Sequence, residues 1–80
     1  MLTGRQMRKA RKLLRWSRIK FSRNILLSPA LVEAVESSDG AAWLTDEQEA
    51  CIRRVCAEAG IRFDIDAEGQ PGAVLAKAVP

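Results

Sequence analysis

The sequence contains no histidine, no tyrosine and only two cysteines among its 80 residues. Histidine is the usual general base at neutral pH and a frequent zinc ligand, so its absence argues against catalysis and against a zinc site within the chain. No serine–lysine pair and no paired carboxylates stand out as another catalytic arrangement. We therefore expect no catalytic residue, no cofactor and no metal ion.

The two cysteines, Cys51 and Cys56, lie five positions apart in a segment that is predicted to be helical. Five residues along a helix separate two side chains by about 140° in projection, so these thiols point apart and cannot easily bridge. We interpret both as small packing residues.

Long apolar runs are also missing. No run is long enough to span a membrane, and the first twelve residues lack the apolar core of a signal peptide. We expect a cytoplasmic protein that has no membrane partner. At 80 residues, with 48% hydrophobic residues, the chain is predicted to fold as one domain over residues 1–80.

Acidic residues are absent from the first 25 positions, which hold nine of the 13 cations. These nine are Arg5, Arg8, Lys9, Arg11, Lys12, Arg15, Arg18, Lys20 and Arg23. The other four cations share the rest of the chain with all ten acids. A basic block of this kind is either a solvated face or a surface for a polyanion or an acidic partner, and its charge alone does not distinguish these.

Capping residues predict where four helices begin. Thr3 with Gln6, and Thr45 with Gln48, have the spacing of a capping box, and Ser17 and Ser28 are further N-cap residues. The predicted helices cover 4–14, 18–25 and 29–37, and a fourth follows Thr45 and stops at Gly60. The first helix is expected to bury Met7, Ala10, Leu13 and Leu14 and to leave Arg5, Arg8, Lys9 and Lys12 in water. The fourth is expected to bury Ala50, Ile52, Val55, Cys56 and Ala59.

A β-hairpin is predicted over residues 61–78. Ile61, Phe63 and Ile65 alternate with polar residues, residues 67–72 have the composition of a turn, and residues 73–78 form a returning strand. An isolated hairpin is marginally stable, so it must pack on the helices or pair with a second copy. The second possibility gives a homodimer through the C-terminal hairpin.

The two short helices within residues 17–37 are joined by a turn of about three residues, which is the spacing of a helix-turn-helix. Here the chain resembles the Cro/repressor-type (XRE-like) helix-turn-helix family, as a short member with a C-terminal β-hairpin. The likeness extends upstream through residues 2–14 and weakly downstream through 44–45, 57–63 and 71–72. The expected fold class is mainly α: a four-helix helix-turn-helix domain followed by the hairpin.

The resemblance implies roles for individual residues. Core positions of the family are matched by Trp16, Phe21, Ile25, Leu27, Val32 and Val35, and Ser22 matches a tight contact between helices. Arg11 and Glu36 match a structural ion pair. Arg18 falls where the family contacts a DNA phosphate, and Arg15, Lys20 and Arg23 are expected to add phosphate contacts.

The chain departs from the family at two kinds of position. Arg15 and Leu26 stand where the family commonly has glycine, so we expect a reshaped turn there. The face of the third helix consists of Ser28, Pro29, Ala30, Leu31, Glu33 and Ala34. Of these, Pro29, Ala30 and Ala34 cannot hydrogen-bond to a base edge, Ser28 can, and Ala30 or Leu31 can touch a thymine methyl. Glu33 repels phosphate.

Two functions follow as hypotheses. The first is a DNA-binding transcriptional regulator that clamps double-stranded DNA through the basic N-terminal helices. The alternative is a degenerate helix-turn-helix that binds a protein partner through the apolar face of the third helix.

Overall fold

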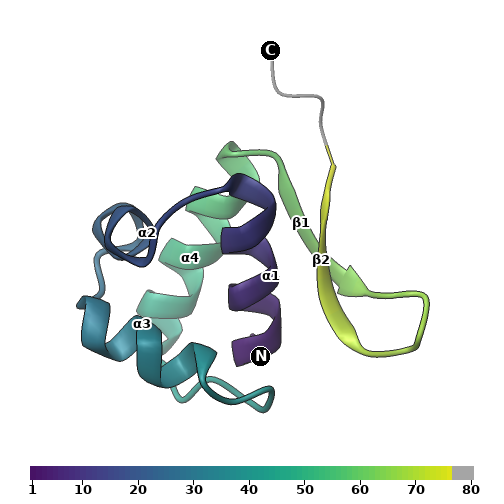
Figure 1. The fold of residues 1–80 in the computed structure, drawn as a ribbon, viewed down its shortest axis with the longest axis horizontal. Helices are drawn as coiled ribbons and strands as arrows, with labels where there is room; N and C mark the ends of the chain where they lie inside the picture. The colour runs from purple at the N-terminus through teal and green to yellow at the C-terminus, as the bar shows by residue number, and fades with distance from the viewer. Residues whose placement is uncertain (77–80) are drawn as a thin grey trace.

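Four helices and a two-stranded antiparallel hairpin follow one another along the chain (Figure 1). The computed structural model describes residues 1–76. The elements are α1 (Gly4–Leu14), α2 (Arg18–Ile25), α3 (Pro29–Glu36), α4 (Asp46–Glu58), β1 (Ile61–Ile65) and β2 (Pro71–Leu75). α1 lies between α3 and the hairpin and contacts both α3 and β2, whereas α4 contacts α2 and β1. The predicted mainly α architecture with a C-terminal hairpin is therefore confirmed.

Each helix begins at its predicted capping residue. The Thr3 hydroxyl accepts a hydrogen bond from the Gln6 amide at 3.1 Å, and the Gln6 side chain accepts one from the Thr3 amide at 3.1 Å. Thr45 heads α4 in the same reciprocal arrangement, and Ser17 and Ser28 cap α2 and α3 with their hydroxyls. A cap of this type is worth about 1 kcal/mol, and it fixes each helix start locally.

The turns that follow α1 and α2 keep a left-handed residue although neither contains glycine there. Arg15 has φ 57° and Leu26 has φ 60°. The expectation of a reshaped turn is therefore wrong. The amide of Arg15 still donates to the Lys12 carbonyl at 3.1 Å, and that of Leu26 donates to the Ser22 carbonyl. Holding a residue with a Cβ in this conformation costs about 1–2 kcal/mol.

The core draws apolar side chains from all six elements. Its members are Leu2, Met7, Ala10, Phe21, Ile25, Leu27, Val32, Ala42, Ile52, Cys56, Ile61 and Ala73, with Trp16, Leu14 and Val35 packed against them. Ser22 is also buried, as expected for a tight contact. Two predicted core residues are exposed. Leu13 lies at the margin of the apolar face of α1, beside a hollow between α1 and β2. Ala50 lies about 200° around α4 from the buried Ile52, so it is on the exposed side of that helix.

The hairpin pairs Ile61 with Leu75 and Ile65 with Pro71. Its second strand begins at Pro71, two residues earlier than predicted. Proline is tolerated there because the position opposite Ile65 does not donate a hydrogen bond to β1. The Asp66 carboxylate closes the turn by accepting the amides of Glu68 and Gln70, each at 2.9 Å. Residues 77 and 78 of the predicted hairpin lie outside the described residues.

The segment before α1 is tied to the loop that follows α3. Ala42 donates to the Leu2 carbonyl at 2.9 Å, and the Gly4 amide donates to the Gly40 carbonyl at 2.9 Å. A Cβ on Gly4 would stand 2.0 Å from the Ser38 carbonyl oxygen. Glycine is therefore required at the first position of α1 by this close approach between backbones.

Candidate functional site

A buried carboxylate joins the first three helices. The Glu36 side chain, at the end of α3, is 1% exposed. The Arg11 guanidinium of α1 donates to both of its oxygens, with Nε at 3.0 and 2.9 Å and Nη2 at 2.8 Å. Arg18 of α2, whose side chain is half-exposed, brings its Nε to 3.7 Å from the same carboxylate. Two guanidinium groups thus surround one carboxylate, which leaves this cluster with one positive charge in excess.

Three cations of α1 that the sequence placed in water instead lie within ion-pair distance of distant acids. Arg5 donates to Asp66 at 2.6 Å and to the Pro71 carbonyl at 3.1 Å. Arg8 donates to the Asp39 carboxylate and, at 2.7 Å, to the Glu36 carbonyl. The partners in the Arg5–Asp66 and Arg8–Asp39 pairs are 61 and 31 residues apart in the chain, so the local spacing of residues does not predict these contacts. The Lys9 ammonium also lies 3.8 Å from the Asp66 carboxylate. The expectation that Arg5, Arg8 and Lys9 are solvated is therefore wrong, whereas Lys12 is exposed as expected.

The pKa values of these groups follow from their contacts. The Arg8 guanidinium lowers the pKa of Asp39, and the hydrogen bond to Asp66 raises the pKa of Arg5. The pKa of Asp66 is lowered to about 2, chiefly by the Gln70 amide and then by Arg5. Arg5 and Arg8 therefore tie α1 to other parts of the fold.

The remaining cations of residues 12–23 form what we call the open basic group: Lys12, Arg15, Lys20 and Arg23. All four are exposed, and within residues 1–76 none lies within ion-pair distance of a carboxylate. The Lys20 ammonium lies 5.2 Å from the centre of the Trp16 ring, a cation–π contact that leaves its charge uncompensated. Three of the four predicted phosphate-contact residues belong to this group, and Arg18 adjoins it.

The predicted face of α3 is exposed except at Leu31. Pro29, Ala30, Glu33 and Ala34 face solvent, whereas Leu31 is half-buried against the core. The Ser28 hydroxyl oxygen accepts the Leu31 amide at 3.2 Å, so part of its hydrogen-bonding capacity is used in capping α3. The face is therefore mostly apolar and carries one negative charge.

An apolar hollow adjoins this face. It has a volume of about 200 Å³ and is lined by Leu31, Ala34, Val35, Ala41, Ala42 and Trp43. Trp43 is 86% exposed, the highest value among the large apolar side chains of residues 1–76. Sequence reasoning assigned Trp43 no role, because its position beside α3 depends on how the loop after α3 folds back.

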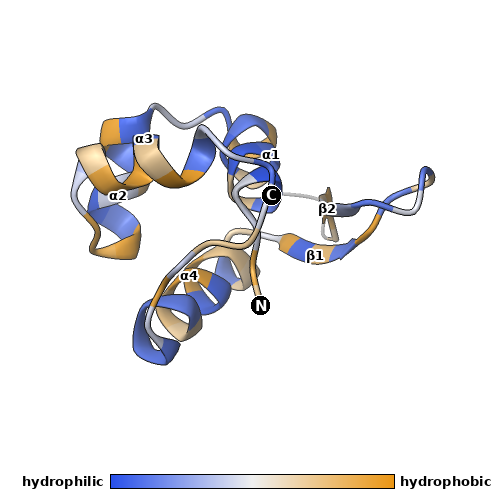
Figure 2. Ribbon diagram, turned by 90° about the horizontal axis from the view of Figure 1, so that it is seen from below, coloured by the Kyte–Doolittle hydropathy of each residue, from blue (hydrophilic) through white to orange (hydrophobic). Residues whose placement is uncertain are grey.

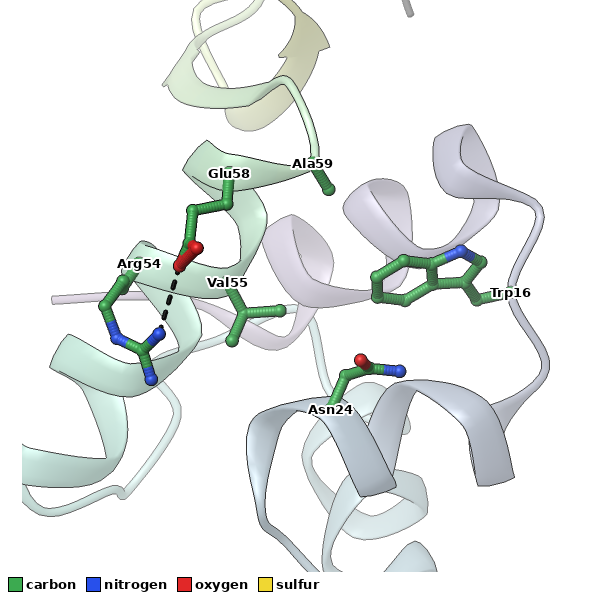
Figure 3. A pocket seen from close by; sticks show the side chains of 6 residues that line it. All are labelled: Trp16, Asn24, Arg54, Val55, Glu58 and Ala59. Atoms are coloured by element: carbon green, nitrogen blue, oxygen red, sulfur yellow. Dashed lines mark hydrogen bonds and ion pairs between the residues drawn. The ribbon is translucent and has the colours of Figure 1, made fainter.

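A second hollow, of about 430 Å³, opens between α2 and α4 (Figure 3). It is lined by Trp16, Asn24, Arg54, Val55, Glu58 and Ala59. Its two charged groups, Arg54 and Glu58, bond to each other at 3.0 Å and are both about two-thirds exposed. No charged side chain is buried in this hollow, so nothing in it favours a particular ligand.

The described residues do not gather ligands for a metal ion. In residues 1–76 no three side chains of histidine, cysteine, aspartate or glutamate lie close enough to hold one. Both cysteines are free; Cys56 is buried, which raises its pKa to about 11, and Cys51 is partly exposed. No helix in this range combines the length and the apolarity needed to cross a membrane.

Comparison with known proteins does not assign the chain to a family, since no family model, curated protein or solved structure matches it significantly. Its function must be inferred from its own residues and geometry. The open basic group and the face of α3 are the two surfaces that carry such an inference.

Proposed function

We propose that the protein is a DNA-binding transcriptional regulator of the helix-turn-helix type, in which α2 and α3 form the DNA-binding unit. The observation that carries this proposal is the open basic group. Its cations have no carboxylate within ion-pair distance in residues 1–76. The charges of Arg5, Arg8 and Arg11, in contrast, are paired with carboxylates. Uncompensated cations beside an exposed short helix suit a phosphate backbone.

In the proposed complex, α3 approaches the major groove and the open basic group binds the flanking phosphates. Direct reading of bases is limited to the Ser28 hydroxyl and to contacts between alanine and thymine methyl groups. The Glu33 carboxylate repels the DNA phosphates and so opposes the approach of α3 to the DNA. We therefore expect strong dependence on salt and a modest sequence preference that arises mainly from DNA shape.

Fluorescence anisotropy with a labelled generic duplex, between about 50 and 200 mM salt, tests the proposal. Each lost phosphate contact lowers the log–log salt slope by about 0.9, so Arg23→Glu and Lys20→Glu should both weaken binding and flatten the slope. Arg54→Glu is the matched control, because Arg54 is an exposed cation of α4 whose only carboxylate contact in residues 1–76 is Glu58. Affinity that is unchanged by Arg23→Glu, or lowered equally by Arg54→Glu, would contradict the proposal.

A second candidate function is protein binding through the face of α3. It is favoured by the hollow beside Trp43, because an exposed tryptophan next to an apolar helix face is typical of a contact with a partner helix. Trp43→Ser should abolish capture of a partner from an extract of the source cells. Leu75→Ser, at an exposed apolar position on β2, is the control. Equal capture by both variants would exclude this surface.

A further inference from the structure

The outer side of α2 carries two exposed apolar side chains. Ile19 is 55% exposed, and Leu26, which caps the end of the helix, is 79% exposed. Leu26 follows Ile19 by about two helical turns, so both lie on the same side of α2, about 10 Å apart along its axis. α2 packs on α3 and α4, and Figure 2 shows no element on the side of α2 that faces away from them. Nothing in residues 1–76 therefore covers this apolar pair.

Leu26 is exposed at a position where leucine is also costly for the backbone. Its φ of 60° is left-handed, a conformation that glycine adopts without strain and that a residue with a Cβ does not. The side chain gains little from the rest of the fold in return, because most of it faces solvent. Backbone strain of this kind is typical of functional positions. The combination indicates that the Leu26 side chain has a use outside the single chain.

Two cations of the open basic group flank the apolar pair. Lys20 and Arg23 lie with Ile19 and Leu26 within about 120° of the circumference of α2. Both cations are exposed, and neither has a carboxylate within ion-pair distance in residues 1–76. The first acid of the chain is Glu33, so α2 itself supplies none. We call these four residues the α2 outer face, which is apolar and positive and carries no negative charge.

The chemistry of the α2 outer face selects the kind of partner. A phosphate backbone would satisfy Lys20 and Arg23 but offers no apolar surface for Ile19 and Leu26. A neutral apolar helix would cover the apolar pair but leave the two cations without partners. A helix with apolar residues at helical spacing and acids beside them matches both features, and such charge complementarity sets the orientation of a complex.

We propose that the α2 outer face is a docking site for an acidic amphipathic helix of another protein. Apolar residues of the partner pack on Ile19 and Leu26, and its carboxylates pair with Lys20 and Arg23. One consequence rests on the proposed function: the same two cations are assigned to DNA phosphates, so the partner and DNA compete for them. Failure of DNA binding would remove this competition and leave the docking site itself unaffected.

A fluorescently labelled peptide of about 18 residues, long enough to form a helix, tests the proposal. Leucines occupy its i, i+3, i+4 and i+7 positions, and glutamates flank them. A scrambled peptide of the same composition has the same charge but no apolar face. In anisotropy titrations the ordered peptide should bind about tenfold more tightly than the scrambled one. Equal binding of the two, or no saturation by the ordered peptide up to about 1 mM, would overturn the proposal.

Lysine substitutions separate docking from attraction between charges alone. Ile19→Lys and Leu26→Lys each add a positive charge, so electrostatic attraction alone would tighten binding of the acidic peptide. Loss of an apolar contact should instead weaken binding about tenfold in each variant. Leu75→Lys, at a 49% exposed apolar position on β2, is the matched control and should bind like the wild type. Tighter binding by the α2 variants, or equal weakening by Leu75→Lys, would refute the docking site.

Leu26→Gly tests the argument from backbone strain. Glycine relieves the left-handed strain, so the variant should raise Tm by about 4–8 °C while it weakens peptide binding about tenfold. A lower Tm, or peptide binding as tight as that of the wild type, would contradict the role of Leu26.

Sedimentation velocity of the protein alone tests the other occupant, a second copy of the chain. The wild type and Ile19→Lys should sediment alike, with reductant present because Cys51 is partly exposed. Self-association of the wild type that Ile19→Lys abolishes would assign the α2 outer face to a second copy and overturn the proposal. Circular dichroism checks that each variant is folded.

Discussion

Replacing Arg11 with methionine removes the main partner of a buried charge. Arg11→Met keeps the apolar part of the side chain but deletes three short contacts with the Glu36 carboxylate and a hydrogen bond to the Trp16 carbonyl at 3.2 Å. Arg18, at 3.7 Å and half-exposed, compensates only weakly. The carboxylate is then left in a site where its side chain is 1% exposed.

The expected loss of stability in Arg11→Met follows from these contacts. Removal of one partner from a buried ion pair costs about 3–5 kcal/mol, and the 14% exposure of the Arg11 side chain points to the lower end, about 3 kcal/mol. In a domain of this size, 1 kcal/mol corresponds to about 4–8 °C in Tm, so Arg11→Met should lower Tm by about 12–24 °C. Thermal unfolding followed by circular dichroism measures this change.

Two further variants separate the ion pair from other causes. Lys12→Met alters an exposed cation on the same helix and should change the free energy of unfolding by less than about 0.5 kcal/mol. The double variant with Arg11→Met and Glu36→Leu removes both charges and should regain most of the loss. A double variant no more stable than Arg11→Met alone would refute the view that a stranded carboxylate causes the destabilisation.

Three other changes have defined outcomes. Gly4→Ala should lower the free energy of unfolding by about 1–3 kcal/mol, because the added Cβ meets a backbone oxygen. This loss is expected although alanine favours a helix over glycine by about 1 kcal/mol, and thermal unfolding shows whether the variant is less stable than the wild type. A thiol reagent at about pH 8 should label the partly exposed Cys51 in the native protein but not Cys56, whose burial raises its pKa to about 11; mass spectrometry after digestion distinguishes them. The pKa of Asp66 is lowered from 3.8 to about 2, so the stability that it contributes is present above its unfolded pKa and is lost as the pH falls towards 2. Asp66→Asn should therefore lose less stability than the wild type over that interval in acid titrations of unfolding, and an equal loss would contradict this assignment.

Features fixed by neighbouring residues could be predicted from the sequence. The helix starts at Thr3, Ser17, Ser28 and Thr45 agree with the structure because a cap involves residues three positions apart. The alternating apolar residues of β1 also predict its position, because the two faces of a strand have different surroundings.

Features that depend on distant parts of the chain could not be predicted in this way. Arg5 and Arg8 resemble solvated residues of an amphipathic helix, and their acids come from a loop and a turn far along the chain. The open basic group is therefore smaller than the basic block of the sequence. The exposure of Trp43 likewise depends on tertiary packing, which local periodicity does not encode.

The position of α1 between α3 and β2 has a consequence for synthesis on the ribosome. α1 leaves the ribosome well before β2, the strand that Arg5 and Gln6 contact. Contacts between such distant segments form slowly, because a long loop must close before they provide any stability. The helices can form early, but α1 stays incompletely covered until β2 has emerged. A nascent chain that stalls within the hairpin therefore exposes the side of α1 that faces β2 in the finished fold.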